Sequence, residues 1–146
     1  MKRKLIRISS RDNTIERGGK GWIAPDGQVM PLDSSFEVHG EWMQTHYAEL
    51  SEKYPDLPRL TASDLKKPGW FDKFRDFLVS KGWIHVYGIR DLQVKKLDEN
   101  TKNQITDALM LRQLNLNFPV RIYETSTNNI VSLREGEDGE FIFSID

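Results

Sequence analysis

The three histidines are the residues whose chemistry is easiest to recognise in this chain. His39 and His46 lie seven residues apart in a segment with helical periodicity, which would place them on one face about 10 Å apart along the axis. A shared metal ion usually takes histidines at i and i+4, as in H-E-x-x-H, and that spacing is absent. A metal site would therefore need His85 or a carboxylate to converge on them. We expect no metal or other cofactor; the candidate ligands would be His39, His46 and His85, joined by an acid such as Asp26, Asp33 or Asp91.

Proton transfer is the second chemistry that these residues could perform. An unperturbed imidazole has a pKa near 6.5, so His39 could act as a general base or contact a ligand, with His85 and Asp26 as further candidates. The alternative is structural: His39 would hold a hairpin through a backbone carbonyl, and His46 and His85 would be partly exposed. The sequence contains neither a Gly-x-Ser-x-Gly motif nor a phosphate-binding glycine loop. Enzymatic activity stays open, with the balance of residues against it.

Aromatic residues form a third group, with four tryptophans and seven phenylalanines in 146 residues. Most should lie in the core, where large aromatic side chains dominate burial. Pro68-Gly69-Trp70-Phe71, however, begins a helix beside a loop, where an exposed ring could anchor a partner. The candidate partner-binding residues are Trp70, Phe71, Lys67 and Trp22.

The charges are unevenly distributed although the formal net charge is only −1. Residues 1–20 contain seven basic and two acidic residues, and residues 134–146 contain one basic and five acidic residues. A basic arm with Lys2, Arg3, Lys4 and Arg7 could bind nucleic acid. The alternative, favoured by the alternation of charge with Leu5, Ile6 and Ile8, is that the two ends are neighbouring strands that neutralise each other.

Other classes of function are excluded by composition. Without cysteine there are no disulfides, thiolate metal sites or cysteine nucleophiles. The sequence has neither a signal-peptide core nor an apolar run that could span a membrane. We therefore expect a soluble intracellular protein with no membrane partner.

A tetrapeptide that occurs twice, Lys20-Gly21-Trp22-Ile23 and Lys81-Gly82-Trp83-Ile84, helps to place the elements. Each glycine should end the preceding element before a strand begins. The first copy runs into Pro25-Asp26-Gly27, a turn signal that predicts a hairpin of residues 22–23 with 29–30. Further strands are expected at 3–8, 83–87, 92–97, 120–123, 130–133 and 141–145, and helices at 34–54, 70–82 and from 98 to about 112.

These elements predict an α+β fold, with a mostly antiparallel sheet and about three helices packed on one face. Residues 1–146 should form a single domain. Within it, 55–69 should be a surface loop with a possible short helix at 63–67.

A family resemblance depends on short motifs placed along these elements. They are Gly21-Trp22-Ile23, Pro25-Asp26-Gly27, Asp33-Ser34 and His39, then Gly82-Trp83-Ile84 and Thr101-Lys102-Asn103-Gln104. Over roughly residues 20–123 the chain resembles small uncharacterised domains encoded by bacteriophages and conjugative elements, including those within polyvalent proteins. It departs from them at His85, where an arginine is expected, and in the longer 55–69 segment.

The resemblance implies an origin in a mobile element that acts inside or upon a bacterium. Because no catalytic residue is established for such domains, none is carried over. We therefore expect an accessory protein that binds a bacterial or phage protein, either as a modulator of a host factor or defence system or as an assembly component. Its location would be the host cytoplasm or the virion. The alternatives are a small enzyme or ligand-binding domain centred on His39, and nucleic-acid binding through the basic N-terminal segment.

Overall fold

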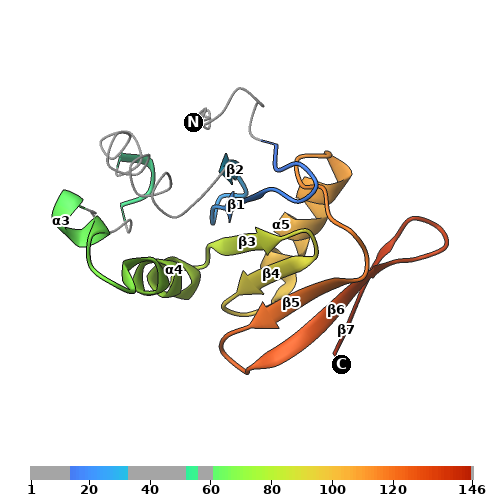
Figure 1. Ribbon diagram of the computed structural model, residues 1–146. Helices are drawn as coiled ribbons and strands as arrows, with labels where there is room; N and C mark the ends of the chain where they lie inside the picture. The colour runs from blue at the N-terminus through green and yellow to red at the C-terminus, as the bar shows by residue number, and fades with distance from the viewer. Residues whose placement is uncertain (1–13, 33–51, 56–60, 146) are drawn as a thin grey trace.

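The computed structural model describes residues 14–32, 52–55 and 61–145, and within them seven strands form one sheet (Figure 1). The strand order is β2-β1-β3-β4-β5-β6-β7. The strands are β1 (Lys20–Ile23), β2 (Val29–Leu32), β3 (Ile84–Gly88), β4 (Asp91–Val94), β5 (Val120–Glu124), β6 (Asn129–Glu135) and β7 (Phe141–Ile145). The helices in these ranges are α3 (Ala62–Leu65), α4 (Trp70–Ser80) and α5 (Glu99–Met110). The predicted α+β class is confirmed.

Strand pairing is antiparallel at every junction of the sheet except one. β4 and β5 are parallel, with Leu92 opposite Ile122, and α5 lies in the connection between them. A parallel pair needs such a crossover because a tight turn can only join antiparallel neighbours. The expectation of a mostly antiparallel sheet is therefore also confirmed.

Two of the hairpins use the same turn. In the first, the N–H of Ala24 donates to the carbonyl of Gln28 (2.9 Å), and Gly27 has φ +91°. In the second, the N–H of Gly136 donates to the carbonyl of Glu140 (2.7 Å), and Gly139 has φ +81°. Glycine adopts this left-handed conformation without a steric penalty. The predicted Pro-Asp-Gly turn thus has the mechanism expected for it.

The two copies of the tetrapeptide lie side by side in the sheet. Ile23 of β1 is opposite Ile84 of β3, and the rings of Trp22 and Trp83 meet edge to face at 6.3 Å. Gly82, with φ +96°, ends α4 as expected. The expectation for Gly21 was wrong, because it lies inside β1.

The helix starts follow their capping residues. Asp98 accepts a hydrogen bond from the N–H of Thr101 (2.9 Å) at the start of α5, and Thr61 forms a capping box with Asp64 at α3. α3 lies within the 55–69 segment, where a possible short helix was expected at 63–67. The predicted strand 3–8 and most of the predicted helix 34–54 lie outside the described residues.

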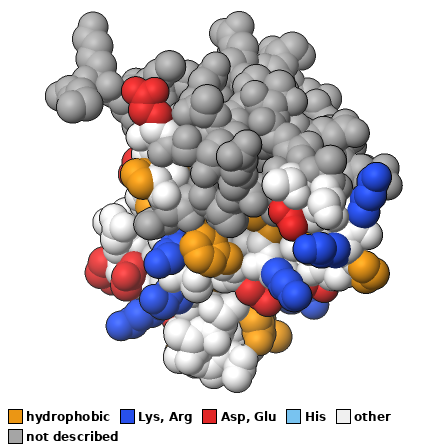
Figure 2. Space-filling view, turned by 90° about the vertical axis from the view of Figure 1, so that its left-hand side faces the viewer, with side chains coloured by type: hydrophobic (Ala, Val, Ile, Leu, Met, Phe, Trp, Pro, Cys, Tyr) orange, Lys and Arg blue, Asp and Glu red, His pale blue; other side chains and the backbone are white. Residues whose placement is uncertain are grey.

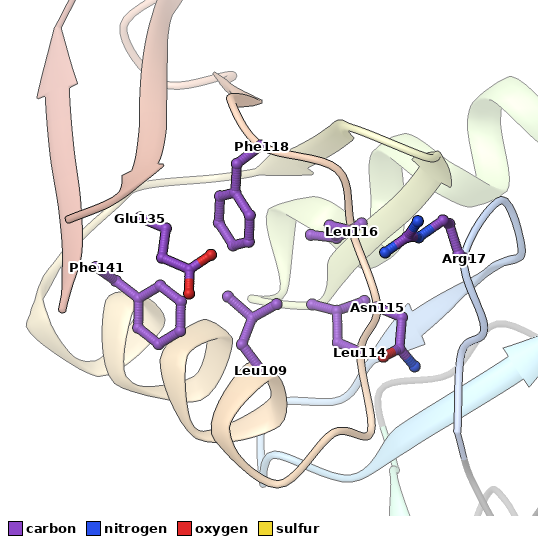
Figure 3. Close-up of a pocket in the computed structure, with 8 residues that line it drawn as sticks. All are labelled: Arg17, Leu109, Leu114, Asn115, Leu116, Phe118, Glu135 and Phe141. Atoms are coloured by element: carbon purple, nitrogen blue, oxygen red, sulfur yellow. The ribbon is translucent and has the colours of Figure 1, made fainter. Parts of the chain in front are cut away.

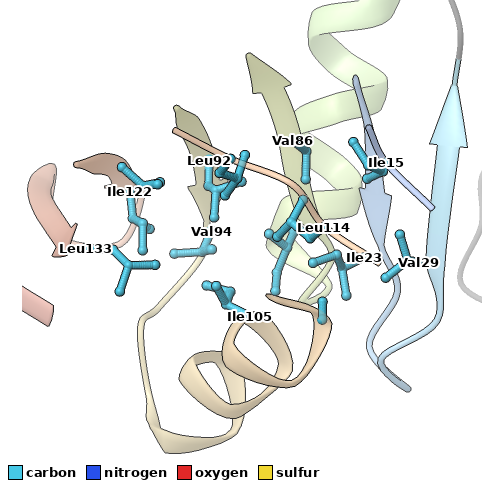
Figure 4. Close-up of a cluster of buried hydrophobic side chains, with 14 of the residues drawn as sticks. Ile15, Ile23, Val29, Val86, Leu92, Val94, Ile105, Leu114, Ile122 and Leu133 are labelled. Carbon is cyan, nitrogen blue, oxygen red and sulfur yellow. The ribbon is translucent and has the colours of Figure 1, made fainter. Parts of the chain in front are cut away.

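Two hydrophobic clusters cover opposite faces of the sheet. On one face Ile105 of α5 lies in a cluster with residues such as Ile23 and Leu92 (Figure 4), and Ala108 of α5 belongs to the same cluster. On the other, α4 lies over β3 and β4, and its apolar side chains share a cluster with residues of β1 and β2: Trp22, Ala24, Met30, Tyr54, Phe71, Phe74, Leu78, Val79 and Trp83. The expectation that the helices share one face was therefore wrong for α4 and α5. Neighbouring residues of β1, such as Trp22 and Ile23, point to opposite faces and both are buried.

Candidate functional site

Two of the residues predicted to bind a partner belong to the core. Trp22 is 3% exposed and Phe71 is also buried, and both lie in the cluster beneath α4. Trp70 is half-buried, and its ring lies 5.6 Å from that of Phe71. Lys67 is exposed. The prediction was thus wrong for Trp22 and Phe71, because α4 turns its apolar stripe toward the sheet.

His85 is likewise buried rather than partly exposed. It is opposite Trp22 in the β1–β3 pair, and the two rings stack with centroids 4.5 Å apart. Phe71 lies 5.8 Å away, and only 7% of His85 is exposed. An imidazole enclosed by aromatic rings is poorly placed to exchange protons with a substrate. Its expected role as a base is therefore not supported by its surroundings.

Asp26 belongs to a polar cluster at the tip of the first hairpin. The hydroxyl of Tyr54 lies 3.1 Å from Oδ1 of Asp26 and 3.2 Å from Oε1 of Gln28, whose side chain is fully buried. Lys53 also contacts Gln28, and its Nζ is 3.8 Å from Asp26. Because buried polar groups need such partners, the cluster fixes residues 53–54 onto the hairpin. Tyr54 and Gln28 were missed in the sequence, where nothing but their proximity to turns sets them apart.

The predictions for the other two histidines and for the basic N-terminal arm concern residues that the structure does not describe. His39, His46, Lys2, Arg3, Lys4 and Arg7 lie outside the described residues. Among the residues that are described, no group of three or more metal-ligating side chains occurs. The helices of the described part include none long and apolar enough to cross a membrane.

The strongest candidate site is a part of the sheet that α4 leaves uncovered. On the face that carries α4, which contacts β3 and β4, no helix among the described elements lies over β5 to β7. We call this surface, together with Tyr87 at its border, the open face. Its main side chains are Tyr87, Gln93, Arg121, Tyr123, Ile130, Arg134 and Ile142.

Two tyrosines, Tyr87 and Tyr123, are prominent side chains of the open face. Tyr87 is 40% exposed, and its ring lies 5.5 Å from the ring of the buried His85. The phenol of Tyr87 therefore reaches the surface while its ring lies beside a buried aromatic side chain. Tyr123 is half-buried and its hydroxyl donates to Oδ1 of Asn128 (2.8 Å). Burial and, to a smaller extent, the Asp91 carboxylate raise the pKa of Tyr87. At neutral pH the phenol therefore remains a hydrogen-bond donor.

Arg121 of the open face and Arg75 of the adjacent α4 are held by carboxylates. Nη2 and Nε of Arg121 lie 2.8 and 3.0 Å from Oδ1 of Asp91, and 62% of the Arg121 side chain is exposed. On the adjacent α4, Arg75 pairs with Asp72 (3.3 Å) and Asp76 (3.1 Å). Both guanidinium groups are therefore oriented before any partner arrives, and their charges are balanced locally.

Mixed charge also characterises the neighbouring surface. Figure 2 views the molecule from the side of α3 and α4, and basic and acidic side chains lie next to each other there with hydrophobic side chains between them. A nucleic-acid site would instead require an excess of basic groups over the contact area. In the described part of this face, the charges thus favour a protein surface over a phosphate backbone.

A cavity of about 160 Å³ lies on the other side of the sheet (Figure 3). Arg17 and Glu135 approach it from opposite sides, and both are exposed. It is lined otherwise by Leu109, Leu114, Asn115, Leu116, Phe118 and Phe141. Its volume would admit a group the size of a benzene ring. Because the charged lining residues, Arg17 and Glu135, are both exposed to solvent, the lining does not favour one chemical class of ligand.

The open face could have been recognised in the sequence. In Val120-Arg121-Ile122-Tyr123, apolar residues alternate with arginine and tyrosine, which predicts a strand with one solvated face. The residues predicted to bind a partner, Trp70, Phe71, Lys67 and Trp22, did not include Arg121 or Tyr123. Comparisons of the sequence with protein-family models and with curated proteins, and of the fold with solved structures, found no match. Function is therefore inferred from the contacts described above.

Proposed function

We propose that this chain is an accessory protein of a bacteriophage or other mobile element that acts by binding a protein partner through the open face. The observation that carries the proposal is the group of Tyr87, Tyr123 and Arg121 on one face of the sheet, beside α4 and beyond the reach of the other described helices. The partner would be a folded protein whose own surface carries charges of both signs, because Arg121 and the neighbouring Arg75 are already balanced by aspartates.

Composition and rigidity both support this interface. Tyrosine and arginine are enriched at the energetic centres of protein interfaces. Tyr87 rests on the ring of His85, and Arg121 is fixed by Asp91, so little side-chain entropy would be lost on binding. Ile130 and Ile142, both exposed, would add apolar contact area around this centre.

The biological setting comes from the motif resemblance of residues 20–123. It supports a bacterial host protein, a phage protein or another component of an assembly as the partner. The corresponding location is the host cytoplasm or the virion.

Affinity capture from a nuclease-treated bacterial lysate tests the proposal. The wild-type chain should retain one protein in stoichiometric amount, and the double variant Tyr87→Ala/Arg121→Ala should lose it. Met110→Ala/Leu111→Ala is the matched control, because these exposed residues lie at the end of α5 on the other side of the sheet. Thermal melting of each variant shows that it is folded.

The contrary outcomes are equally specific. Equal capture by the open-face variant and the control would remove the open face as the interface. If all capture depended on nucleic acid, the basic N-terminal segment would replace protein binding as the function.

A further inference from the structure

We propose that β7 is a docking edge, at which an extended, basic-flanked segment of the protein partner adds to the sheet as an eighth strand. This inference rests on the proposed protein-binding function but uses a different surface, the outer edge of the sheet. Among the described strands, β7 is the last in the sheet order, at the end away from β2 (Figure 1).

The pairing register shows which backbone groups of β7 face outward. The Gly136 N–H to Glu140 carbonyl bond makes these two residues a hydrogen-bonded pair. Such pairs alternate along an antiparallel ladder, so Ile142 and Ser144 direct their N–H and C=O groups toward β6. The corresponding groups of Phe141, Phe143 and Ile145 therefore point away from the sheet.

The two ends of the sheet differ in how they are protected. By the same alternation from Ala24 and Gln28, the outward positions of β2 are Val29 and Pro31, and proline has no N–H to offer. β7 has the sequence Phe-Ile-Phe-Ser-Ile, without proline, lysine or any other charge. Ile142 is 46% exposed and Ile145 is 71% exposed. Natural edge strands usually carry a feature that blocks pairing, and within β7 itself none is found.

Charge next to β7 identifies the chemistry of the added strand. The end of β6 and the turn that leads into β7 carry Glu135, Glu137, Asp138 and Glu140, all exposed. Among the ion pairs of the described residues, none involves these four carboxylates. A strand flanked by lysine or arginine would complement them. A second copy of β7 would bring the same acidic turn, so charge favours a different chain as the occupant.

The test uses a synthetic peptide, acetyl-KKVTVTVKK-amide, titrated into the ¹⁵N-labelled full chain. The amide signals of Phe143 and Ile145 should shift, and their hydrogen exchange should slow as their N–H groups become bonded. The acidic peptide acetyl-EEVTVTVEE-amide should bind about tenfold more weakly or less. Shifts confined to other elements, or equal binding of both peptides, would overturn the proposal.

A pair of variants isolates the backbone contribution. Ile145→Pro removes an outward N–H without removing a bond to β6, and Ile145→Ala removes the side chain alone. Peptide affinity should fall about tenfold or more in Ile145→Pro and stay within about twofold in Ile145→Ala. Equal affinities would overturn strand addition. So would a concentration-dependent dimer of the wild-type chain that Ile145→Pro abolishes, because the occupant would then be a second copy.

The same variants separate this inference from the proposed function. A lysate partner that Tyr87→Ala/Arg121→Ala loses but Ile145→Pro retains would overturn the docking edge and leave the open face intact. A partner lost only by Ile145→Pro would do the reverse.

Discussion

At the scale of single residues, the surroundings of a side chain decide what its chemistry can be used for. His85 has the ring that suits proton transfer, but Trp22 and Phe71 enclose it. Arg121 appears in the sequence as an unremarkable strand residue, yet Asp91 holds it in position on an exposed face. The sequence lists both residue types, whereas their accessibility depends on strand pairing across more than 60 residues for His85 and on a parallel neighbour for Arg121.

Glu124 offers a residue-scale prediction about pH. The pKa of Glu124 is lowered, mainly because its carboxylate accepts the backbone N–H of Leu97 (2.6 Å) and also the hydroxyl of Thr127. A lowered pKa means that the stabilisation is complete above the ordinary value of 4.5 and is lost as the pH falls through the lower, native value.

We therefore expect Glu124→Gln to melt below the wild type at pH 6, and the gap to narrow by about 2 °C or more toward pH 3. Melting curves across this range check it, with Glu137→Gln in the exposed turn as the control. A gap that stays constant with pH would show that the carboxylate charge of Glu124 is unimportant.

At the scale of elements, local sequence signals were sufficient where the chain itself determines geometry. The Pro-Asp-Gly turn, the cap of α5 at Asp98 and the end of α4 at Gly82 all follow from steric and hydrogen-bonding preferences of a few residues. The faces of the sheet were harder to assign, because Trp22 and Ile23 are both apolar and leave no polar alternation to follow. Such continuous apolar runs are typical of strands that are covered on both faces of a sheet. The run in β1 could therefore have predicted that both of its faces are buried.

The cap of α5 supplies the element-scale prediction. In Asp98→Ala the N–H of Thr101 would lose its acceptor at the start of the helix that crosses from β4 to β5. We expect the melting temperature to fall by about 2–4 °C. Asn103→Ala, an exposed change within the same helix, should leave it unchanged or raise it slightly. Equal effects of the two changes would mean that the cap contributes nothing specific.

At the scale of the whole molecule, the sheet separates two hydrophobic clusters that meet its opposite faces. Trp22 is central to the cluster under α4, where it contacts Phe74, Trp83 and His85, whereas Trp70 packs at its margin. The sequence alone could not show which tryptophan contributes most to the hydrophobic core. That contribution depends on the strand or helix face that each tryptophan occupies.

Alanine substitution of the two tryptophans measures this ranking. Trp22→Ala should lower the free energy of unfolding by about 3–5 kcal/mol, because it leaves a large cavity in the core. Trp70→Ala should cost only about 1–2 kcal/mol, as expected of a half-buried ring. Chemical denaturation of both variants provides the comparison. A larger loss for Trp70 would place it at the centre of the cluster instead.

Pro31 has a consequence for the size of any assembly. If strands can be added only beyond β7, each molecule can bind one partner by strand addition. Chains with two receptive edges can propagate into fibres, whereas a chain with one receptive edge terminates growth after a single event. Complexes formed through this sheet should therefore be discrete and of fixed stoichiometry, even at high concentrations of the protein.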